Sequence, residues 1–207
     1  MAKALFITLE GGDGAGKSTQ IENIKKYFEE KGKECVITRE PGGTPVGEKL
    51  REVLLDCSNG EMEDVTEMMI FAASRAQHVR ELIRPSLADG KIVICDRFKD
   101  SSLAYQGIGR DLGDMVENVN NIAVDGLVPD ITFWLDVDPE TGKARASNAG
   151  ELDRLEREKM DFHQKVYEGY LKLCRENPER IKRIDATKPI EEIKEDIYAE
   201  LDKLVNC

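Results

Sequence analysis

The chain has 207 residues, of which 40% are apolar and 34% charged, and its formal net charge is −11. This composition excludes a disordered chain and supplies one sizeable core, so we expect a single domain over residues 1–207. The acidic balance disfavours nucleic acid and anionic membranes as partners, and an anionic substrate would need a local cluster of arginine and lysine.

The expected location follows from what the sequence lacks. No apolar run reaches the ~20 residues of a membrane helix, and the first residues do not resemble a signal peptide. The five cysteines are widely spaced and include no Cys-x-x-Cys pair, which disfavours a disulfide framework or a zinc site. We therefore expect a cytoplasmic protein without a membrane partner.

Short apolar runs that favour strands alternate with longer segments of helical periodicity. The expected strands cover residues 4–9, 34–38, 91–95, 131–137 and 180–185. The expected helices cover residues 17–31, 46–55, 65–87, 112–124, 156–177 and 190–205. Because alternation of this kind is typical of parallel pairing, the sequence predicts an α/β fold with a five-stranded parallel sheet flanked by helices.

A glycine-rich loop follows the first expected strand and matches the pattern Gly-x-x-x-x-Gly-Lys-[Ser/Thr]. Its glycines allow close approach to phosphate, and backbone N–H groups at the start of the next helix would face the anion. Lys17 is expected to reach the β- and γ-phosphates, and the Ser18 hydroxyl to ligate Mg²⁺. A chance turn is the alternative, but the position between strand and helix favours a nucleoside triphosphate site. The loop reads Gly11-Gly12-Asp13-Gly14-Ala15-Gly16-Lys17-Ser18.

Candidate groups for a second substrate follow the second strand. Arg39 opens a loop rich in proline and glycine, and Arg51 lies on the next expected helix. Phe71 and Arg75 are four residues apart on the long helix and share a face, so they could stack on and hydrogen-bond a planar base. Because apolar residues surround Phe71, its spacing alone favours a core position.

Asp96 and Arg97 follow the third strand directly. A carboxylate beside the phosphate loop is well placed to hold Mg²⁺, and a guanidinium there can hold a phosphate. A purely structural pair is the alternative. The short helix expected next offers groups that suit a sugar or a base edge, from Ser102, Tyr105 and Gln106.

Basic residues also flank residues 147–153, which fit no regular element. Phosphoryl transfer needs positive charge near the transferred group, and the variable positions of the phosphate loop contain no arginine. We therefore expect a mobile lid at about residues 143–157 that closes over the triphosphate, although a solvated charged helix face is the alternative. The basic residues are Lys143, Arg145, Arg154 and Arg157.

Six blocks that span nearly the whole chain resemble the signature blocks of the thymidylate kinase family, bacterial type. They are residues 12–19 (GDGAGKST), 38–45 (TREPGGTP), 71–79 (FAASRAQHV), 96–98 (DRF), 101–107 (SSLAYQG) and 150–154 (GELDR). The resemblance implies a three-layer P-loop nucleoside-monophosphate kinase fold, a homodimer, and the Mg²⁺-dependent reaction of ATP with dTMP that gives ADP and dTDP for dTTP biosynthesis. Ser74, Phe98 and His163 depart from the commoner Asp, Tyr and Phe of the family.

The resemblance also implies residue roles. For the acceptor, Phe71 would stack on thymine, Arg75 would bond its edge, and Ser102 and Gln106 would contact its other side. Tyr105 would crowd the sugar 2′ position. Asp13 would meet the sugar 3′-hydroxyl or the ion near the acceptor phosphate, which Arg39, Arg51 and Arg97 would surround. For the donor, ATP would be bound by residues 11–19, Thr19 included, with Arg145 near adenine or phosphate. The catalytic set would be Lys17, Asp96, Arg97 and Arg154, and the metal ligands Ser18 and Asp96.

Two other functions are compatible with the phosphate loop. A kinase for dUMP, UMP or CMP would share it, but Tyr105 and Phe71 favour a deoxypyrimidine. A regulatory ATPase would share it too, but would not need arginines converging beyond the strand ends.

Overall fold

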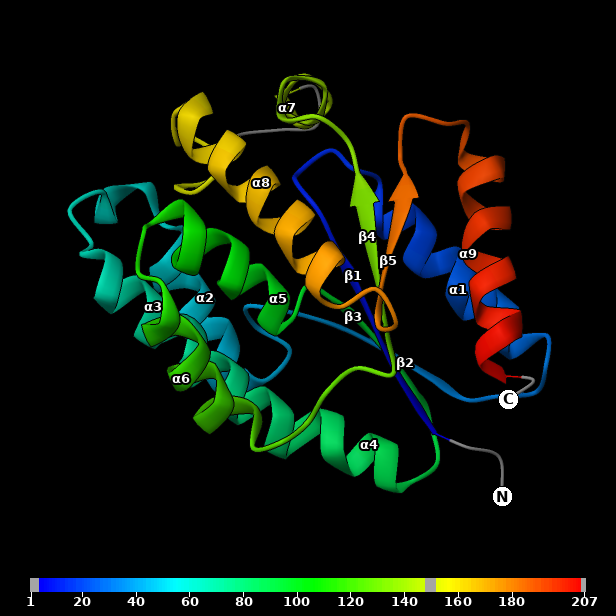
Figure 1. The fold of residues 1–207 in the computed structure, drawn as a ribbon. Coiled ribbons are helices and arrows are strands. Elements are labelled where there is room, and N and C mark those ends of the chain that lie inside the picture. The colour runs from blue at the N-terminus through cyan, green and yellow to red at the C-terminus, as the bar shows by residue number, and fades with distance from the viewer. Residues whose placement is uncertain (1–3, 148–151, 206–207) are drawn as a thin grey trace.

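The computed structural model describes residues 4–147 and 152–205. Within them, five parallel strands form one sheet in the order β2-β3-β1-β4-β5 (Figure 1). Every strand lies within one residue of its expected bounds, which confirms the predicted sheet. The strands are β1 (Leu5–Glu10), β2 (Cys35–Arg39), β3 (Ile92–Asp96), β4 (Ile131–Asp136) and β5 (Ile181–Asp185).

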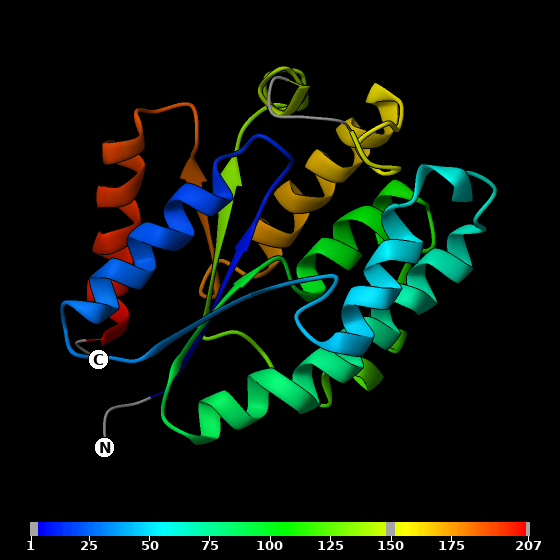
Figure 2. The same cartoon turned by 180° about the vertical axis from the view of Figure 1, so that it is seen from behind.

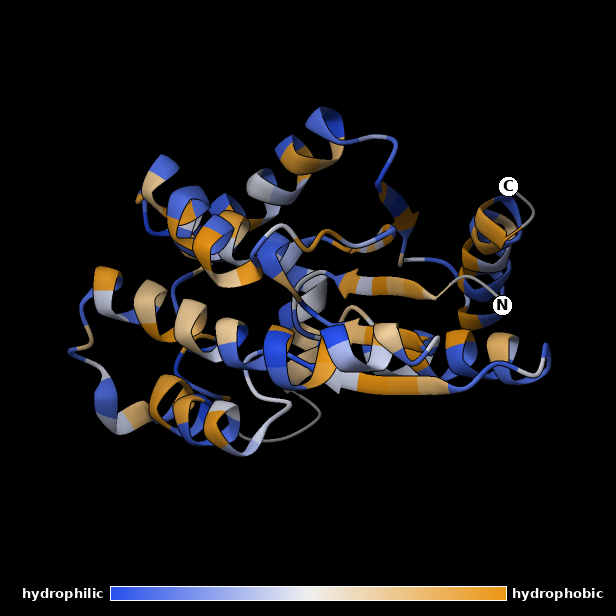
Figure 3. Cartoon of the chain, turned by 90° about the horizontal axis from the view of Figure 1, so that it is seen from below, coloured by the Kyte–Doolittle hydropathy of each residue, from blue (hydrophilic) through white to orange (hydrophobic). Residues whose placement is uncertain are grey.

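One face of the sheet is covered by α1 (Lys17–Glu29) and α9 (Ile190–Val205), as Figure 2 shows from behind. Phe28 and Leu201 from these helices are buried in one cluster with Ile7 of the central strand. The strands are mostly hydrophobic in colour in Figure 3 because helices cover both of their faces.

Apart from α7 (Pro139–Ser147), which lies beyond the carboxyl ends of the strands, the other helices lie on the opposite face of the sheet, which gives three layers (Figure 1). Trp134 of β4 is buried with side chains of α8 (Met160–Glu176), and Phe6 of β1 is buried with Val79 and Ile83. This layering confirms the predicted fold class. The remaining helical segments on the described part of the chain are α2 (Pro45–Leu55), η1 (Cys57–Asn59), α3 (Asp64–His78), η2 (Val79–Ile83), α4 (Arg84–Ala88), α5 (Lys99–Ser102), η3 (Leu103–Gly109), α6 (Asp114–Val124), α7 (Pro139–Ser147) and α8 (Met160–Glu176).

Two segments differ from the expected elements. The long helix expected over residues 65–87 contains a π-helical turn, η2, because Pro85 has no N–H with which to continue the α-helical ladder. The first part of the expected lid is helical and belongs to α7, which begins at Pro139. Asp138 caps this helix, because its Oδ1 accepts from the Thr141 N–H at 2.9 Å.

The topology places the site. β1 pairs with β3 on one side and with β4 on the other, so the loop after β1 emerges between these two strand ends. All five carboxyl ends point toward α7 (Figure 1). Among the described residues, no helix is long and apolar enough to cross a membrane.

Candidate active site

The phosphate loop lies directly against α7. Gly14 has a φ of 75°, and a Cβ on it would lie 2.3 Å from the Gly142 carbonyl oxygen and 2.9 Å from the Arg145 Cβ. Only glycine fits such an approach. Gly16, with a φ of 89°, leads straight into α1, so the N-terminus of that helix opens onto the loop.

Lys17 is buried inside this loop. Its Nζ donates to the carbonyl oxygens of Gly11 and Gly12 at 3.3 and 3.1 Å. Burial and the nearby Arg97 lower the pKa of Lys17, although neighbouring carboxylates act in the opposite direction. The ammonium is therefore held in place by the loop itself, where it can meet the terminal phosphates of a nucleotide.

A large, open cavity, which we call the donor cavity, lies in front of the loop and has a volume of about 560 Å³. Arg145 reaches it from the end of α7 and also donates from Nη1 to the Ala186 carbonyl at 3.1 Å. The cavity has a volume and a lining of N–H and cationic groups that suit a nucleoside triphosphate. Its lining includes Asp13, Gly14, Gly16, Lys17, Ser18, Thr19, Arg39, Arg51, Asp96, Arg97 and Arg145.

Asp96 ends β3 in the wall of the donor cavity. Its Oδ1 is buried and accepts no hydrogen bond from the described residues. An orphaned carboxylate oxygen near a serine hydroxyl and a phosphate site fits Mg²⁺, which uses few protein ligands together with substrate phosphates. Residues 4–147 and 152–205 contain no group of three or more His, Cys, Asp or Glu side chains that could hold a metal ion. Ser18 and Asp96 are therefore the groups that would hold magnesium.

Arg97 connects the phosphate loop with the second substrate site. Its φ is 68°, a left-handed conformation, and its Nη2 donates to Asp13 Oδ1 at 2.8 Å. Burial alone would raise the pKa of Asp13, but Arg97 and Lys17 outweigh it and lower that pKa. Arg97 also lies over the Tyr105 ring, 5.2 Å from its centroid. The guanidinium is thus fixed between the two sites.

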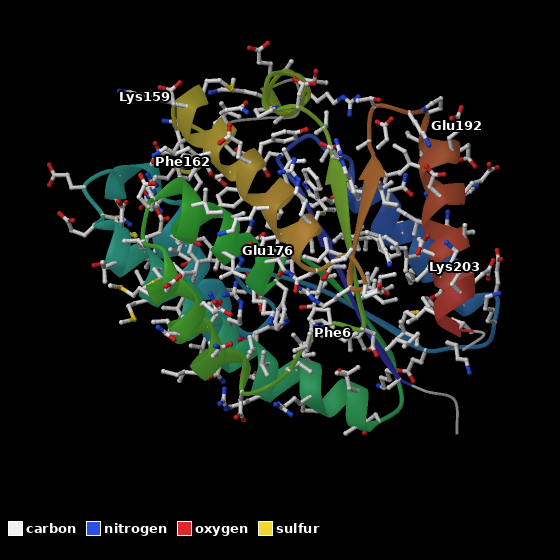
Figure 4. All side chains as sticks on the ribbon, viewed as in Figure 1. Phe6, Lys159, Phe162, Glu176, Glu192 and Lys203 are labelled. Carbon is white, nitrogen blue, oxygen red and sulfur yellow. The ribbon has the colours of Figure 1, made fainter. Side chains whose placement is uncertain are left out.

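A second, narrower cavity of about 150 Å³, the acceptor cavity, lies beyond Arg97. Phe71 is half-buried and lines this cavity, so the core position that its spacing favours is wrong. Tyr105 is fixed there by Phe162, whose ring centroid lies 6.0 Å away. Figure 4 labels Phe162 on α8. The expected acceptor residues come together here, namely Asp13, Arg51, Phe71, Arg75, Arg97, Ser102, Tyr105 and Gln106.

Arg75 is buried and its donors are almost fully used. Nε donates to Glu40 Oε2 at 2.7 Å, Nη1 donates to Ser102 Oγ at 3.0 Å and also to Asn120 Oδ1, and Nη2 donates to the Phe98 carbonyl at 3.2 Å. One Nη2 hydrogen is left for a ligand. The sequence reasoning missed Glu40, although a buried arginine requires a carboxylate and Glu40 stands within the TREPGGTP block.

Ser74 and the outer arginines have separate roles. Ser74 Oγ accepts from the Gly42 N–H at 3.2 Å, so Glu40, and not residue 74, orients Arg75. Arg51 donates to the Pro41 carbonyl at 2.9 Å and lines both cavities. Arg39 is half exposed, pairs with Glu48 at 2.8 Å, and lines only the donor cavity.

Arg154 does not lie at the phosphate loop. Its Nε donates to the Leu54 carbonyl at 2.8 Å and its Nη2 to Glu67 Oε2 at 2.7 Å, and it lines neither cavity. Arg145 is the expected lid arginine that reaches the donor cavity. The catalytic role expected for Arg154 stays a prediction, and the centre of the expected lid, residues 148–151, lies outside the described residues.

A phosphate loop beneath a helix N-terminus, opening into a second cavity lined by arginines and a base-sized aromatic platform, defines a P-loop nucleoside-monophosphate kinase. The model of the thymidylate kinase family matches residues 9–197. The chain belongs to the thymidylate kinase family.

Individual relatives are similar in sequence to this chain along nearly their full lengths. The chain is 48% identical over 200 residues to the thymidylate kinase of Clostridium novyi (strain NT), covering 95% of this chain and 98% of the relative. It is 49% identical over 194 residues to the thymidylate kinase of Exiguobacterium sp. (strain ATCC BAA-1283 / AT1b), covering 93% of this chain and 92% of the relative. The crystal structure of thymidylate kinase from Ehrlichia chaffeensis superposes with a TM-score of 0.79 at 33% identity, covering 96% of this chain and 98% of that one. These findings confirm the resemblance drawn from the sequence blocks.

Proposed function

We propose that this enzyme transfers the γ-phosphoryl group of ATP to dTMP, giving ADP and dTDP, as a step in dTTP biosynthesis. The observation that carries the proposal is that the donor and acceptor cavities share Asp13, Arg51 and Arg97 in their walls. The two phosphates that react would therefore meet between these groups. An oxygen of the dTMP phosphate attacks the γ-phosphorus, and the bond to the β–γ bridging oxygen breaks as ADP leaves.

On the donor side, the backbone of the phosphate loop would hold the β-phosphate and Lys17 the oxygens of the β–γ bridge. Ser18 and Asp96 would hold Mg²⁺, which supplies further positive charge to the phosphate oxygens when bound. No strong general base is needed because the acceptor phosphate is itself a competent nucleophile. We therefore assign Asp96 to the metal and not to proton abstraction.

On the acceptor side, Phe71 would stack on the thymine ring, and the remaining Nη2 hydrogen of Arg75 would be donated to a base oxygen. Gln106 and Ser102 line the same cavity and would contact the base. Tyr105 would exclude a 2′-hydroxyl and favour deoxyribose. Arg51 and Arg97 would hold the acceptor phosphate, with Arg39 at the outer edge.

An assay with dTMP, dUMP, UMP and dCMP tests the function, and Phe71→Ala tests the stacking. Because base–aromatic stacking contributes about 1–3 kcal/mol, Phe71→Ala should raise the KM for dTMP by roughly 5- to 150-fold. The variant should leave the KM for ATP unchanged, and Phe71→Tyr should retain dTMP binding. ATP turnover that does not depend on any monophosphate would instead support a regulatory ATPase.

We also propose a homodimer formed through α3 and α6, which pack against each other. Val65, Met69 and Ala73 recur every four residues and form an exposed stripe on α3, and Ile122 of α6 is 77% exposed. Exposed apolar stripes of this kind are typical of subunit interfaces. Sedimentation should give twice the chain mass, and Met69→Lys should give the single mass while Ile190→Lys on α9 does not. A wild-type monomer would contradict the proposal.

The proposed place of action is the cytoplasm. Cys35, Cys57, Cys95 and Cys174 are free thiols, which supports a reducing compartment. ATP and dTMP, the proposed substrates, are the partners that the site requires.

A further inference from the structure

Glu67, in the first turn of α3, is fully buried and lines neither cavity. Its Oε1 accepts from Gln106 Nε2 at 2.8 Å and, at 3.4 Å, from Arg110 Nε. Its Oε2 accepts from Arg154 at 2.7 Å and from Arg110 Nη2 at 3.0 Å. Burial alone would raise the pKa of Glu67, but its bonds from Arg110, Gln106 and Arg154 outweigh burial and lower that pKa. Glu67 is therefore an ionised carboxylate, which can only accept hydrogen bonds.

This carboxylate fixes the amide of Gln106. Only the nitrogen end of an amide can face an acceptor, so Nε2 must point toward Glu67 and Oε1 away from it. Gln106 is 1% exposed but contributes to the wall of the acceptor cavity, and none of the described residues donates to its Oε1. The side chain therefore offers the cavity an oriented acceptor whose direction is set before any ligand binds.

An oriented acceptor distinguishes the two natural deoxypyrimidines. Thymine carries a donor, N3–H, beside the acceptor O4, whereas cytosine carries an acceptor at N3 beside a donor amino group. An amide oxygen pairs with the N3–H of thymine and is left facing a second acceptor in cytosine. Arg75, oriented by Glu40, offers a donor that matches O4. Each of the two base-facing groups is thus oriented by a buried carboxylate, Arg75 by Glu40 and Gln106 by Glu67.

We propose that Glu67 is a positioning residue that makes the enzyme prefer dTMP over dCMP, by fixing the Gln106 amide with its oxygen toward the base. Glu67 itself does not touch the substrate. The inference deepens the proposed function and rests on it, because it assigns a part of base selection to a residue outside the cavity.

The test compares wild type with Glu67→Gln. The new amide can present either end to Gln106, so the orientation of Gln106 is no longer imposed. The ratio of kcat/KM for dTMP to that for dCMP should fall about tenfold. With dCMP bound, the Gln106 amide can turn and pair with cytosine, which removes one buried mispaired group, while Arg75 continues to favour thymine. The change should lie in the KM values of the monophosphates. The ratio of dTMP to dUMP should stay constant, since thymine and uracil share the same edge.

Arg110→Met is the matched control, because it removes an ion pair of Glu67 but leaves the bond to Gln106. Its dTMP to dCMP ratio should equal that of wild type. If Glu67→Gln does not fold, Glu67→Asp keeps the charge but withdraws the carboxylate from Gln106, and should lower the ratio in the same direction. In Gln106→Leu, adding Glu67→Gln should change the ratio no further.

An unchanged ratio of dTMP to dCMP in a folded Glu67 variant, or an equal fall in Arg110→Met, would overturn the proposal for Glu67. Either result would leave the proposed function intact, provided that the wild type phosphorylates dTMP. A wild-type enzyme that does not phosphorylate dTMP would overturn the proposed function, and this inference with it.

Discussion

Lys17→Met is expected to lower kcat by about three orders of magnitude, the largest effect of any single substitution at this site. Methionine keeps the length and the apolar stem of the side chain and removes only the ammonium. That ammonium contacts two loop carbonyls and would otherwise meet the charge that develops on the β- and γ-phosphates. Lys17 does not line the acceptor cavity, so the KM for dTMP should change little. Steady-state kinetics with each substrate varied measure both quantities.

Thermal unfolding separates this effect from misfolding. Lys17 is a buried charge without a carboxylate within hydrogen-bonding distance among the described residues, so its removal should leave the melting temperature unchanged or raise it. Lys91→Met is the control, because Lys91 pairs with exposed Glu34 far from the loop and should leave kcat at the wild-type value. A kcat for Lys17→Met within tenfold of wild type would rule out the role given to Lys17.

The parts of the site that could be predicted from the sequence are those encoded locally. The phosphate loop depends on glycine spacing within eight residues, and Asp96 follows a short apolar run that is typical of a buried strand. Since β1 and β3 are covered on both faces, their apolar runs also fixed the strand bounds closely. The start of α7 was encoded too, in Asp138 followed by Pro139, but the surrounding charges favoured a lid loop instead.

The parts that could not be predicted depend on contacts between distant residues. Phe71 is surrounded in sequence by apolar residues, and only the packing of α3 against its neighbours shows that its ring faces a cavity. Glu67 and Gln106 are separated by 39 positions, and nothing in either segment indicates the other. Glu40 and Arg75 are likewise joined only by the fold. Periodicity identifies a face of a helix, but not what lies opposite it.

The two arginines expected to act from the lid should separate sharply in kinetics. Arg145→Ala is expected to lower kcat about 100-fold, because Arg145 lies against the phosphate loop and lines the donor cavity, where its charge can stabilise the transferred group. Arg154→Ala should leave kcat within about fivefold of wild type in the folded enzyme. Its main effect should be on stability, with a loss of about 3 kcal/mol, because it withdraws one of the cationic partners of buried Glu67.

Kinetics below the melting temperature of each variant, together with chemical denaturation, measure these effects separately. Arg157→Ala serves as the control, since Arg157 is exposed and its side chain donates, within the described part of the chain, to the Leu152 carbonyl alone. If kcat collapsed in folded Arg154→Ala and persisted in Arg145→Ala, Arg154 would have to leave Glu67 when ATP binds. Glu67 would then keep Arg110 as its cationic partner. Because Glu67 also binds Gln106, the binding of ATP would be coupled to the position of Gln106 through this carboxylate. A kcat near wild type for Arg154→Ala, together with the expected loss in Arg145→Ala, would place the positive charge at the transferred phosphate on Arg145.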